Sequence, residues 1–257
     1  MTNPVILYNS LIPSATTITV TSEAAGFAKE NAYDWLTFDY WKPSAAGTVY
    51  YTMDFGAAVA VDGWGVAAHD LGVNGASIQL QYSATGAWAG EEVNFGSAIS
   101  TAASEPRLQT GTSQSKRYWR FKIVSAAAAS KIGVLMLGAR LTMNAPLESG
   151  FKPDALAQRY EPTINQSDEA TILGASRRRK LVENSLTFDL LEPSWVRTNW
   201  DPFIRHVELG KGFMIQPQPD NYPDEVTYAF AKDNIKTPSH SFVTLMQVSI
   251  DYYGIAA

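Results

Sequence analysis

The stretch that decides the fold is Ser77–Ser83, which reads SIQLQYS. Its apolar residues stand at every second position with polar residues between them, a period that is typical of a strand with one buried face. The stretch Tyr118–Ile123 (YWRFKI) repeats the pattern, with Arg120 and Lys122 opposite three apolar residues. Together the two stretches predict a β-sandwich in which the loops, rather than the strands, carry function.

Composition narrows the class of protein. The chain has 257 residues, 46% of them hydrophobic and 12% aromatic, which is enough for packed cores in one large or two ordinary domains. With 25 acidic and 20 basic residues its net charge is −5, and a duplex nucleic-acid partner is not expected, because neutralising phosphates needs a basic surface. There is no cysteine, so disulfides and thiolate metal sites are excluded. Neither a signal peptide nor membrane insertion is predicted from the apolar runs.

The first part of the chain is rich in predicted strands. We expect strands at Val5–Tyr8, Thr16–Thr21, Val49–Phe55, Trp64–Ala68 and, buried on both faces, Lys131–Met143. The Ser-, Thr- and Gly-rich stretch Phe95–Ser115 is interpreted as a surface connection.

Prolines and glycines between Asn144 and Glu161 predict a domain boundary, so residues 1–145 are expected to form one unit and residues 146–257 a smaller one. In the second unit, alternating residues predict strands around Leu186, Tyr228 and the terminal segment Ser241–Tyr253. The stretch Asp201–Gly210 has an acidic N-cap, a proline at the first helical position and a closing glycine, which predicts a short helix. The fold class is therefore mainly β, a sandwich plus a smaller β-rich module with one short helix.

Several segments of the first unit occur in an order that resembles the discoidin-like or galactose-binding-like jelly roll, of the kind found in bacteriophage tail and virion proteins. They are Asn31–Asp34, Tyr50–Gly56, Gly63–Gly72, Ala76–Ser83 with Trp88, and Tyr118–Phe121. The piece Ala68–Gly72 (AHDLG) is similar to a Gly-His-Asn-Leu-Gly variant of that domain. The carbohydrate-binding arginine and paired loop residues of the sugar-binding branch have no position that aligns, so sugar binding does not carry over. In the second unit, Lys211–Pro217 and Asp224–Phe230 look like the C-terminal part of phage tail-tip proteins.

This resemblance implies a non-enzymatic structural protein of a bacteriophage virion, associated with the tail tip or baseplate. One module would lock into a symmetric ring while the jelly roll projects outward. The expected partners are further copies of the chain, as a homo-oligomer, and other phage tail proteins. The expected location is the virion tail, assembled in the host cytoplasm.

An enzymatic function is not predicted. The three histidines, His69, His206 and His240, are far apart in the sequence, and no nucleophile, metalloprotease or nucleotide-binding motif is present. The candidate carboxylates are scattered, whereas acid–base catalysis needs a pair with separated pKa values.

The aromatic cluster formed by Trp35, Phe38, Tyr40 and Trp41 leaves three alternatives open. It covers the end of the sandwich core, forms a subunit interface, or presents flat rings to a sugar. His69, at the end of a strand, either bonds loop backbone or contacts a ligand or partner. The candidate ligand or partner contacts are Trp35, Tyr40, Trp41, His69 and Trp88. The alternative function is therefore a carbohydrate-binding module that recognises a host cell-surface glycan.

Two charged features complete the candidates. Arg177, Arg178, Arg179 and Lys180 form a basic run in an acidic chain, which is interpreted either as a solvated face or as an inter-subunit salt-bridge edge. The resemblance also implies a structural calcium with Asp34 or Asp39 as an oxygen ligand; the alternative is an Asx turn or a cap. No other cofactor is predicted.

Overall fold

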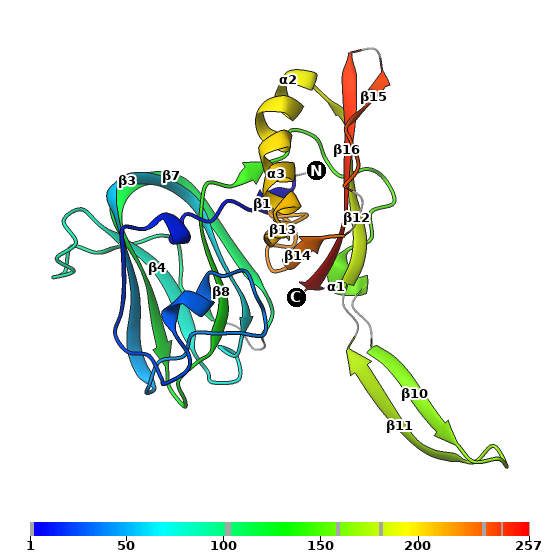
Figure 1. Cartoon of the computed structure of the whole chain (residues 1–257), viewed down its shortest axis with the longest axis horizontal. Coiled ribbons are helices and arrows are strands. Elements are labelled where there is room, and N and C mark those ends of the chain that lie inside the picture. The colour runs from blue at the N-terminus through cyan, green and yellow to red at the C-terminus, as the bar shows by residue number, and fades with distance from the viewer. Residues whose placement is uncertain are drawn as a thin grey trace.

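The computed structural model describes residues 3–100, 104–157, 160–179, 182–232, 235–242 and 244–256. It shows two antiparallel β bodies side by side, with a two-stranded hairpin that projects away from both (Figure 1). The expected fold class, a β-sandwich plus a smaller β-rich module with a short helix, is confirmed.

The first body is the sandwich. Its strands pair in the order β2-β3-β7-β4-β5, with β6 beside β4 and β8 beside β3. Their bounds are β2 Thr17–Val20, β3 Gly47–His69, β4 Ser77–Ser83, β5 Val93–Asn94, β6 Ile99–Ser100, β7 Arg107–Ser125 and β8 Ile132–Gly138. Short 3-10 turns lie at Ile12–Ser14 and Lys29–Ala32.

Strands β3 and β7 are long because each passes from one layer of the sandwich to the other. Their pairing shifts register between Asp54 and Val59, where Gly56 has a φ of 71° that favours glycine. Large apolar side chains, including Trp41, Tyr51, Trp64, Trp119 and Phe121, fill the space between the two layers.

The surface connection expected over Phe95–Ser115 is wrong for its second half, which is strand β7. The first half of β7 has a polar sequence typical of a loop, because several of its side chains are exposed.

The second body is a sheet in the order β12-β16-β14-β13-β1-β9, with β15 beside β16. The bounds are β1 Val5–Leu7, β9 Leu141–Thr142, β12 Val182–Leu191, β13 Phe213–Gln216, β14 Thr227–Ala231, β15 Ser239–Phe242 and β16 Leu245–Ala256. Strands β1 and β9 are the two ends of the expected 1–145 unit, yet they pair here. The fully buried β1 takes one partner on each side, β13 and β9.

A helical stretch covers one face of this sheet. It comprises α2 Pro193–Trp195, a π turn Val196–Trp200 and α3 Asp201–Glu208, and a separate short helix α1 spans Asp154–Ala157. The helix predicted over Asp201–Gly210 is confirmed as α3, with Pro202 in its first turn, where a missing N–H costs nothing; α2 and the π turn that precede it were not predicted. Trp200 and Phe203 pack on the sheet beside Phe213.

A third apolar cluster joins the two bodies, and we call it the seam. It consists of Val5, Leu7, Ala67, Leu108, Val134, Met136, Met214, Val226 and Tyr228. Strand β8 is buried on both faces, as the sequence predicts, because Leu135 and Leu137 enter the sandwich core while Val134 and Met136 enter the seam. At Gly65 an added Cβ would overlap the Met214 sulfur, so β3 and β13 approach closely only without a side chain there. No helix within the described residues is long and apolar enough to span a membrane.

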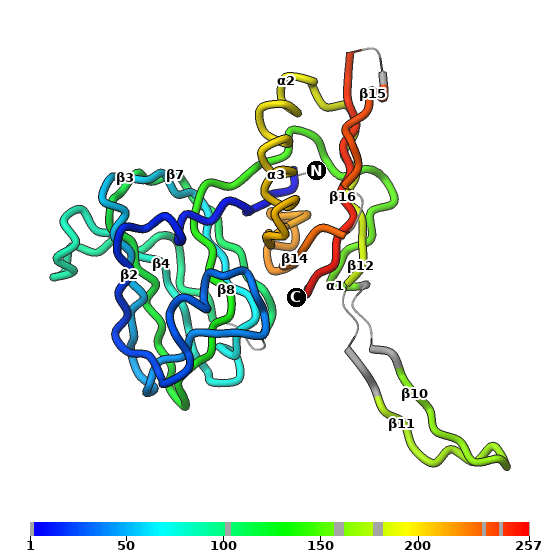
Figure 2. Tube along the Cα trace, in the orientation of Figure 1, coloured from blue at the N-terminus to red at the C-terminus, as the bar shows by residue number. Residues whose placement is uncertain are grey.

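The projecting hairpin is formed by β10 Tyr160–Gln166 and β11 Ile172–Arg179. It leaves the second body near α1, and its tip is far from both sheets (Figure 2).

Candidate functional site

The outward face of the sandwich sheet carries the most organised group of polar and aromatic side chains. Core residues on β3, β7 and β4 alternate with residues that point the other way, among them Tyr50, Arg120 and Gln81. Gln81 and Arg120 are register partners, and the Arg120 Nε donates to Gln81 Oε1 at 2.8 Å. The strand pairing therefore fixes the position of the guanidinium.

Two aromatic rings enclose this guanidinium. The Arg120 Cζ lies 4.2 Å from the centroid of the Tyr50 ring and 4.2 Å from that of the Trp88 ring. Glu92 places Oε1 3.2 Å from Arg120 Nη2. Arg120 is only 6% exposed, so this charge is held by partners rather than by bulk water. We call Trp88, Arg120, Tyr50, Gln81 and Glu92 the Trp88 platform.

The loop that carries Trp88 is held in a strained shape. Trp88 has a φ of 52°, a left-handed conformation that costs a bulky residue about 1–3 kcal/mol. Glu91 clamps the loop by accepting hydrogen bonds from the Ser83 hydroxyl, from Thr85 Oγ1 at 2.7 Å and from the Ala87 N–H at 3.1 Å. The Ser83 and Thr85 hydroxyls lower the pKa of Glu91 to about 2, so the clamp stays ionised at neutral pH. The loop is thus preorganised around one tryptophan.

The arrangement suits recognition rather than chemistry. Its planar polar groups are locked to one another, and Gln81 continues the network by donating to Asn94 Oδ1 at 2.8 Å. Fixed polar groups beside a partly exposed aromatic ring are the usual lining of a small-molecule site. The five platform residues include no histidine or hydroxyl nucleophile other than the Tyr50 phenol. Sequence reasoning named Trp88 but missed Arg120, Tyr50, Gln81 and Glu92, although the charged Arg120 between Trp119 and Phe121 was visible.

The remaining candidate contacts lie elsewhere. Trp41 is 0% exposed in the sandwich core, so it is not available as a ligand contact. His69 is buried; its Nε2 lies 2.8 Å from the Glu105 carbonyl oxygen and its Nδ1 accepts from the Leu71 N–H at 3.3 Å. Burial lowers the pKa of His69 to about 4, so the ring is neutral at physiological pH. Of the two alternatives that the sequence left open for His69, the structure therefore shows the first, a hydrogen bond to loop backbone.

Trp35 and Tyr40 face other parts of the same chain. The Trp35 ring lies edge-on to His206 at 5.1 Å, and its carbonyl accepts from the Tyr228 hydroxyl at 2.7 Å across the seam. Tyr40 stacks on Phe27 at 4.8 Å and faces the Lys131 ammonium. The structure therefore does not bring Trp35, Tyr40, Trp41, His69 and Trp88 together into one site.

The predicted acidic and basic features are also separate. Asp34 Oδ1 accepts from the Leu36 N–H at 2.9 Å, which is an Asx turn. Burial raises the pKa of Asp34, and the Asp39 carboxylate adds to the effect. The described part of the chain holds no cluster of three or more histidine and carboxylate side chains that could bind a metal, and the calcium with Asp34 or Asp39 stays a prediction. The backbones of Arg177, Arg178 and Arg179 lie on β11, and Lys180 lies outside the described residues.

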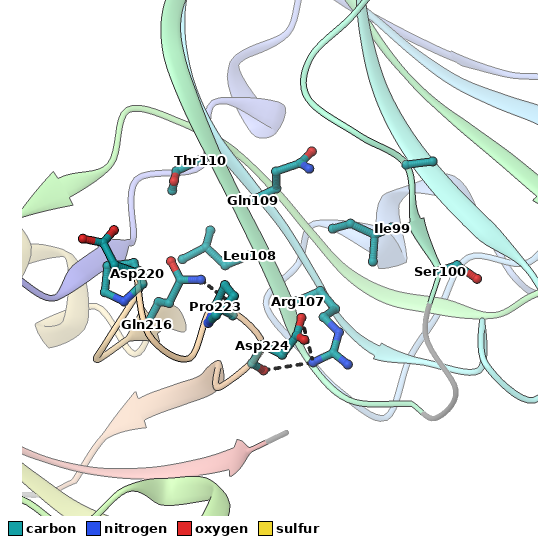
Figure 3. A pocket seen from close by; sticks show the side chains of 12 residues that line it. Ile99, Ser100, Arg107, Leu108, Gln109, Thr110, Gln216, Asp220, Pro223 and Asp224 are labelled. Atoms are coloured by element: carbon teal, nitrogen blue, oxygen red, sulfur yellow. Dashed lines mark hydrogen bonds and ion pairs between the residues drawn. The ribbon is translucent and has the colours of Figure 1, made fainter. Parts of the chain in front are cut away.

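A cavity of about 440 Å³ lies between the bodies, beside β7 and the turn that follows β13 (Figure 3). Arg107 Nη1 donates to the Asp224 carbonyl at 2.9 Å, and its Nη2 pairs with Glu105 at 2.9 Å. The buried Gln216 donates to the Pro223 carbonyl at 2.6 Å, while its Oε1 has no partner among the described residues. Among the described residues no aromatic ring lines this cavity, so it lacks a stacking surface of the kind that the platform has.

Comparison with known proteins adds the following. No protein-family model matches the chain, and no curated protein matches it. Among solved structures, chitosan-binding module 1 of a chitosanase/glucanase from Paenibacillus sp. IK-5 has 16% identity and a TM-score of 0.42, and the match covers 51% of this chain and 100% of that module. The module CpGH89CBM32-5 from Clostridium perfringens, in complex with GalNAc-β-1,3-galactose, has 13% identity and a TM-score of 0.43, over 51% and 100% of the two chains. A GH29 fucosidase from Ruminococcus gnavus in complex with fucose has 13% identity and a TM-score of 0.43, over 53% of this chain and 27% of the enzyme. At these identities and TM-scores, the ligands of the three proteins are not assigned to this chain.

Proposed function

We propose that the chain is a carbohydrate-binding protein and that the Trp88 platform is its binding face. The observation that carries the proposal is the strained Trp88, which the Glu91 clamp holds over the buried Arg120. Left-handed non-glycine residues persist only where their surroundings impose them, and they concentrate at ligand clamps.

The chemistry of the platform fits a sugar. A pyranose presents one face of C–H groups, which stack on an indole ring, and a rim of hydroxyls that each donate and accept hydrogen bonds. Glu92 and Asn94 supply acceptor oxygens beside the ring, and the buried Arg120 holds this group in place through Gln81, Glu92 and the two aromatic rings. The proposed contact lies on the sheet face; of the candidate contacts expected from the sequence it includes Trp88, and it does not include the Trp35 to Trp41 loop or His69.

Glycan-array screening followed by calorimetry with the full chain tests the proposal. Trp88→Ala is expected to weaken binding of the best glycan by about tenfold or more, because the stacking surface is lost. Arg120→Lys is expected to weaken it as well, since an ammonium cannot replace a planar fork that joins Gln81 and Glu92. The matched control is Phe38→Ala, which removes an aromatic ring that is 73% exposed outside the platform and should bind as the wild type does. A wild-type chain that binds no glycan, or a Trp88→Ala variant that binds unchanged, would refute the proposal.

The virion-assembly function expected from the sequence stays a second hypothesis, next to carbohydrate binding. The residue contacts within the sandwich do not distinguish the two. The feature that favours an assembly role of some kind is the projecting hairpin.

A further inference from the structure

The β10–β11 hairpin exposes nearly all of its side chains. From Pro162 to Ser176 every side chain except Ser167 is exposed, including Ile164 at 53%, Ile172 at 65% and Leu173 at 69%. A two-stranded hairpin without packing on a third element is marginally stable in water. Its apolar residues therefore lack the cover that such residues usually have in a folded chain.

The pairing register shows that the ribbon has two unlike faces. Ile164 pairs with Ala175, and Gln166 pairs with Ile172 after a bulge, so these residues share one face with Pro162. The opposite face holds two pairs of small or polar residues, Thr163 with Ser176 and Asn165 with Gly174. An apolar face opposite a polar one is the pattern of a sheet that buries one side.

The charges along the ribbon differ between its two ends. The exposed acids Asp168 and Glu169 form the tip, whereas three arginines, Arg177 to Arg179, lie on β11 at the base, where one acid of β10, Glu161, stands opposite Arg178. Two such ribbons laid antiparallel would therefore bring the acidic tip of each beside the basic base of the other. A second copy of the same chain thus supplies both an apolar face and complementary charges.

The short helix α1, which precedes the hairpin in the chain, is anchored to the second body. Its buried Asp154 accepts hydrogen bonds from Asn184 Nδ2 at 2.6 Å, Thr227 Oγ1 at 2.6 Å and Tyr252 Oη at 2.5 Å. These bonds tie α1 to β12, β14 and β16.

We propose that the β10–β11 hairpin is a self-association arm, which packs its apolar face antiparallel against the same hairpin of a second copy of the chain. The contact is two-fold symmetric, and it turns two isolated ribbons into a four-stranded, two-layer unit with a covered apolar centre. The arm acts independently of the Trp88 platform.

Sedimentation velocity and light scattering on the full chain test the arm. The wild type is expected to be a dimer whose dissociation constant rises about tenfold or more in the double variant Ile164→Gln with Ile172→Gln. The matched control, Thr163→Gln with Asn165→Gln, puts the same side chains on the polar face and should leave the dimer intact. Because these positions are exposed, the thermal midpoint of the monomer should be the same in all variants. A wild type that stays monomeric at its highest soluble concentration, or a control that dissociates as strongly as the apolar-face variant, overturns the proposal.

A charge-swap experiment distinguishes self-association from docking on another protein. Variant one carries Asp168→Lys and Glu169→Lys, and variant two carries Arg177→Glu, Arg178→Glu and Arg179→Glu. Each alone has two ends of like charge and should be monomeric, whereas an equimolar mixture restores both tip-to-base contacts and should form a mixed dimer. A mixture that stays monomeric would refute the antiparallel arrangement.

Discussion

Two loops of this protein hold a tryptophan in the left-handed conformation, and they serve different purposes. Trp35 has a φ of 72° and Trp88 a φ of 52°. The first turns inward, where its carbonyl accepts a hydrogen bond from the Tyr228 hydroxyl and its ring lies edge-on to His206 of α3. The second lies over Arg120 on the outward sheet face. What each ring packs against explains the difference. The Trp35 ring packs against the apolar seam, whereas the Trp88 ring lies on a fixed guanidinium and stays partly exposed.

The largest expected effect that tests this comparison is a loss of stability in the first loop, which also carries Trp41. Trp41→Ala removes a fully buried indole from the sandwich core and is expected to lower the free energy of unfolding by about 3–5 kcal/mol. Trp88→Ala, by contrast, should change it by less than about 1 kcal/mol, since the ring is partly exposed. Urea titration of both variants provides the measurement. Equal destabilisation would show that Trp88 is a core residue and that the platform is only packing.

The sequence predicted the strands far better than the positions of the aromatic side chains. Alternation in β4 and the second half of β7 was sufficient to predict the sandwich, because one buried face imposes a period of two. The same reasoning left Trp35 and Trp41 between core cover, a subunit interface and a sugar contact, since a loop without periodicity does not reveal which body covers it. Strand β1 was placed in the first unit because its partner β13 follows some 200 residues later, a distance that no local pattern spans. The sequence pattern sets Arg120 opposite the apolar face of its strand, and only the fold brings Trp88 and Tyr50 to the two sides of its guanidinium.

The second effect concerns pH. Because burial lowers the pKa of His69 from about 6.5 to about 4, the folded state resists protonation that the unfolded chain accepts. The stability from this neutral ring is fully present above pH 6.5 and is lost as pH falls through 4, in total about 3 kcal/mol. His69→Gln keeps a side-chain N–H for the Glu105 carbonyl and does not titrate, so its unfolding free energy should fall less between pH 7.5 and pH 4. Parallel curves for wild type and variant would mean that the ring is accessible to water and belongs with the surface features.

A smaller effect isolates the inward loop. Tyr228→Phe removes the hydroxyl that donates to the Trp35 carbonyl across the seam and leaves that oxygen without this donor. The expected loss is about 1–2 kcal/mol in the free energy of unfolding, with glycan affinity unchanged. Tyr222→Phe, at a tyrosine that is 55% exposed, is the control and should have little effect. A fall in glycan binding with Tyr228→Phe would show that the two loops are coupled, against the comparison made above.

The smallest effect measures the strain itself. At a φ of 52° alanine retains the steric cost of the left-handed region, whereas glycine does not, so Trp88→Gly should be more stable than Trp88→Ala by about 1 kcal/mol. Both variants lose the indole and should bind glycan equally poorly. The same pair at Trp35 should show the same order, because its backbone conformation is alike. If glycine gives no gain over alanine at position 88 while it does at position 35, the Trp88 loop relaxes once the ring is gone. In that case the ring on Arg120, rather than the Glu91 clamp, is what imposes the conformation.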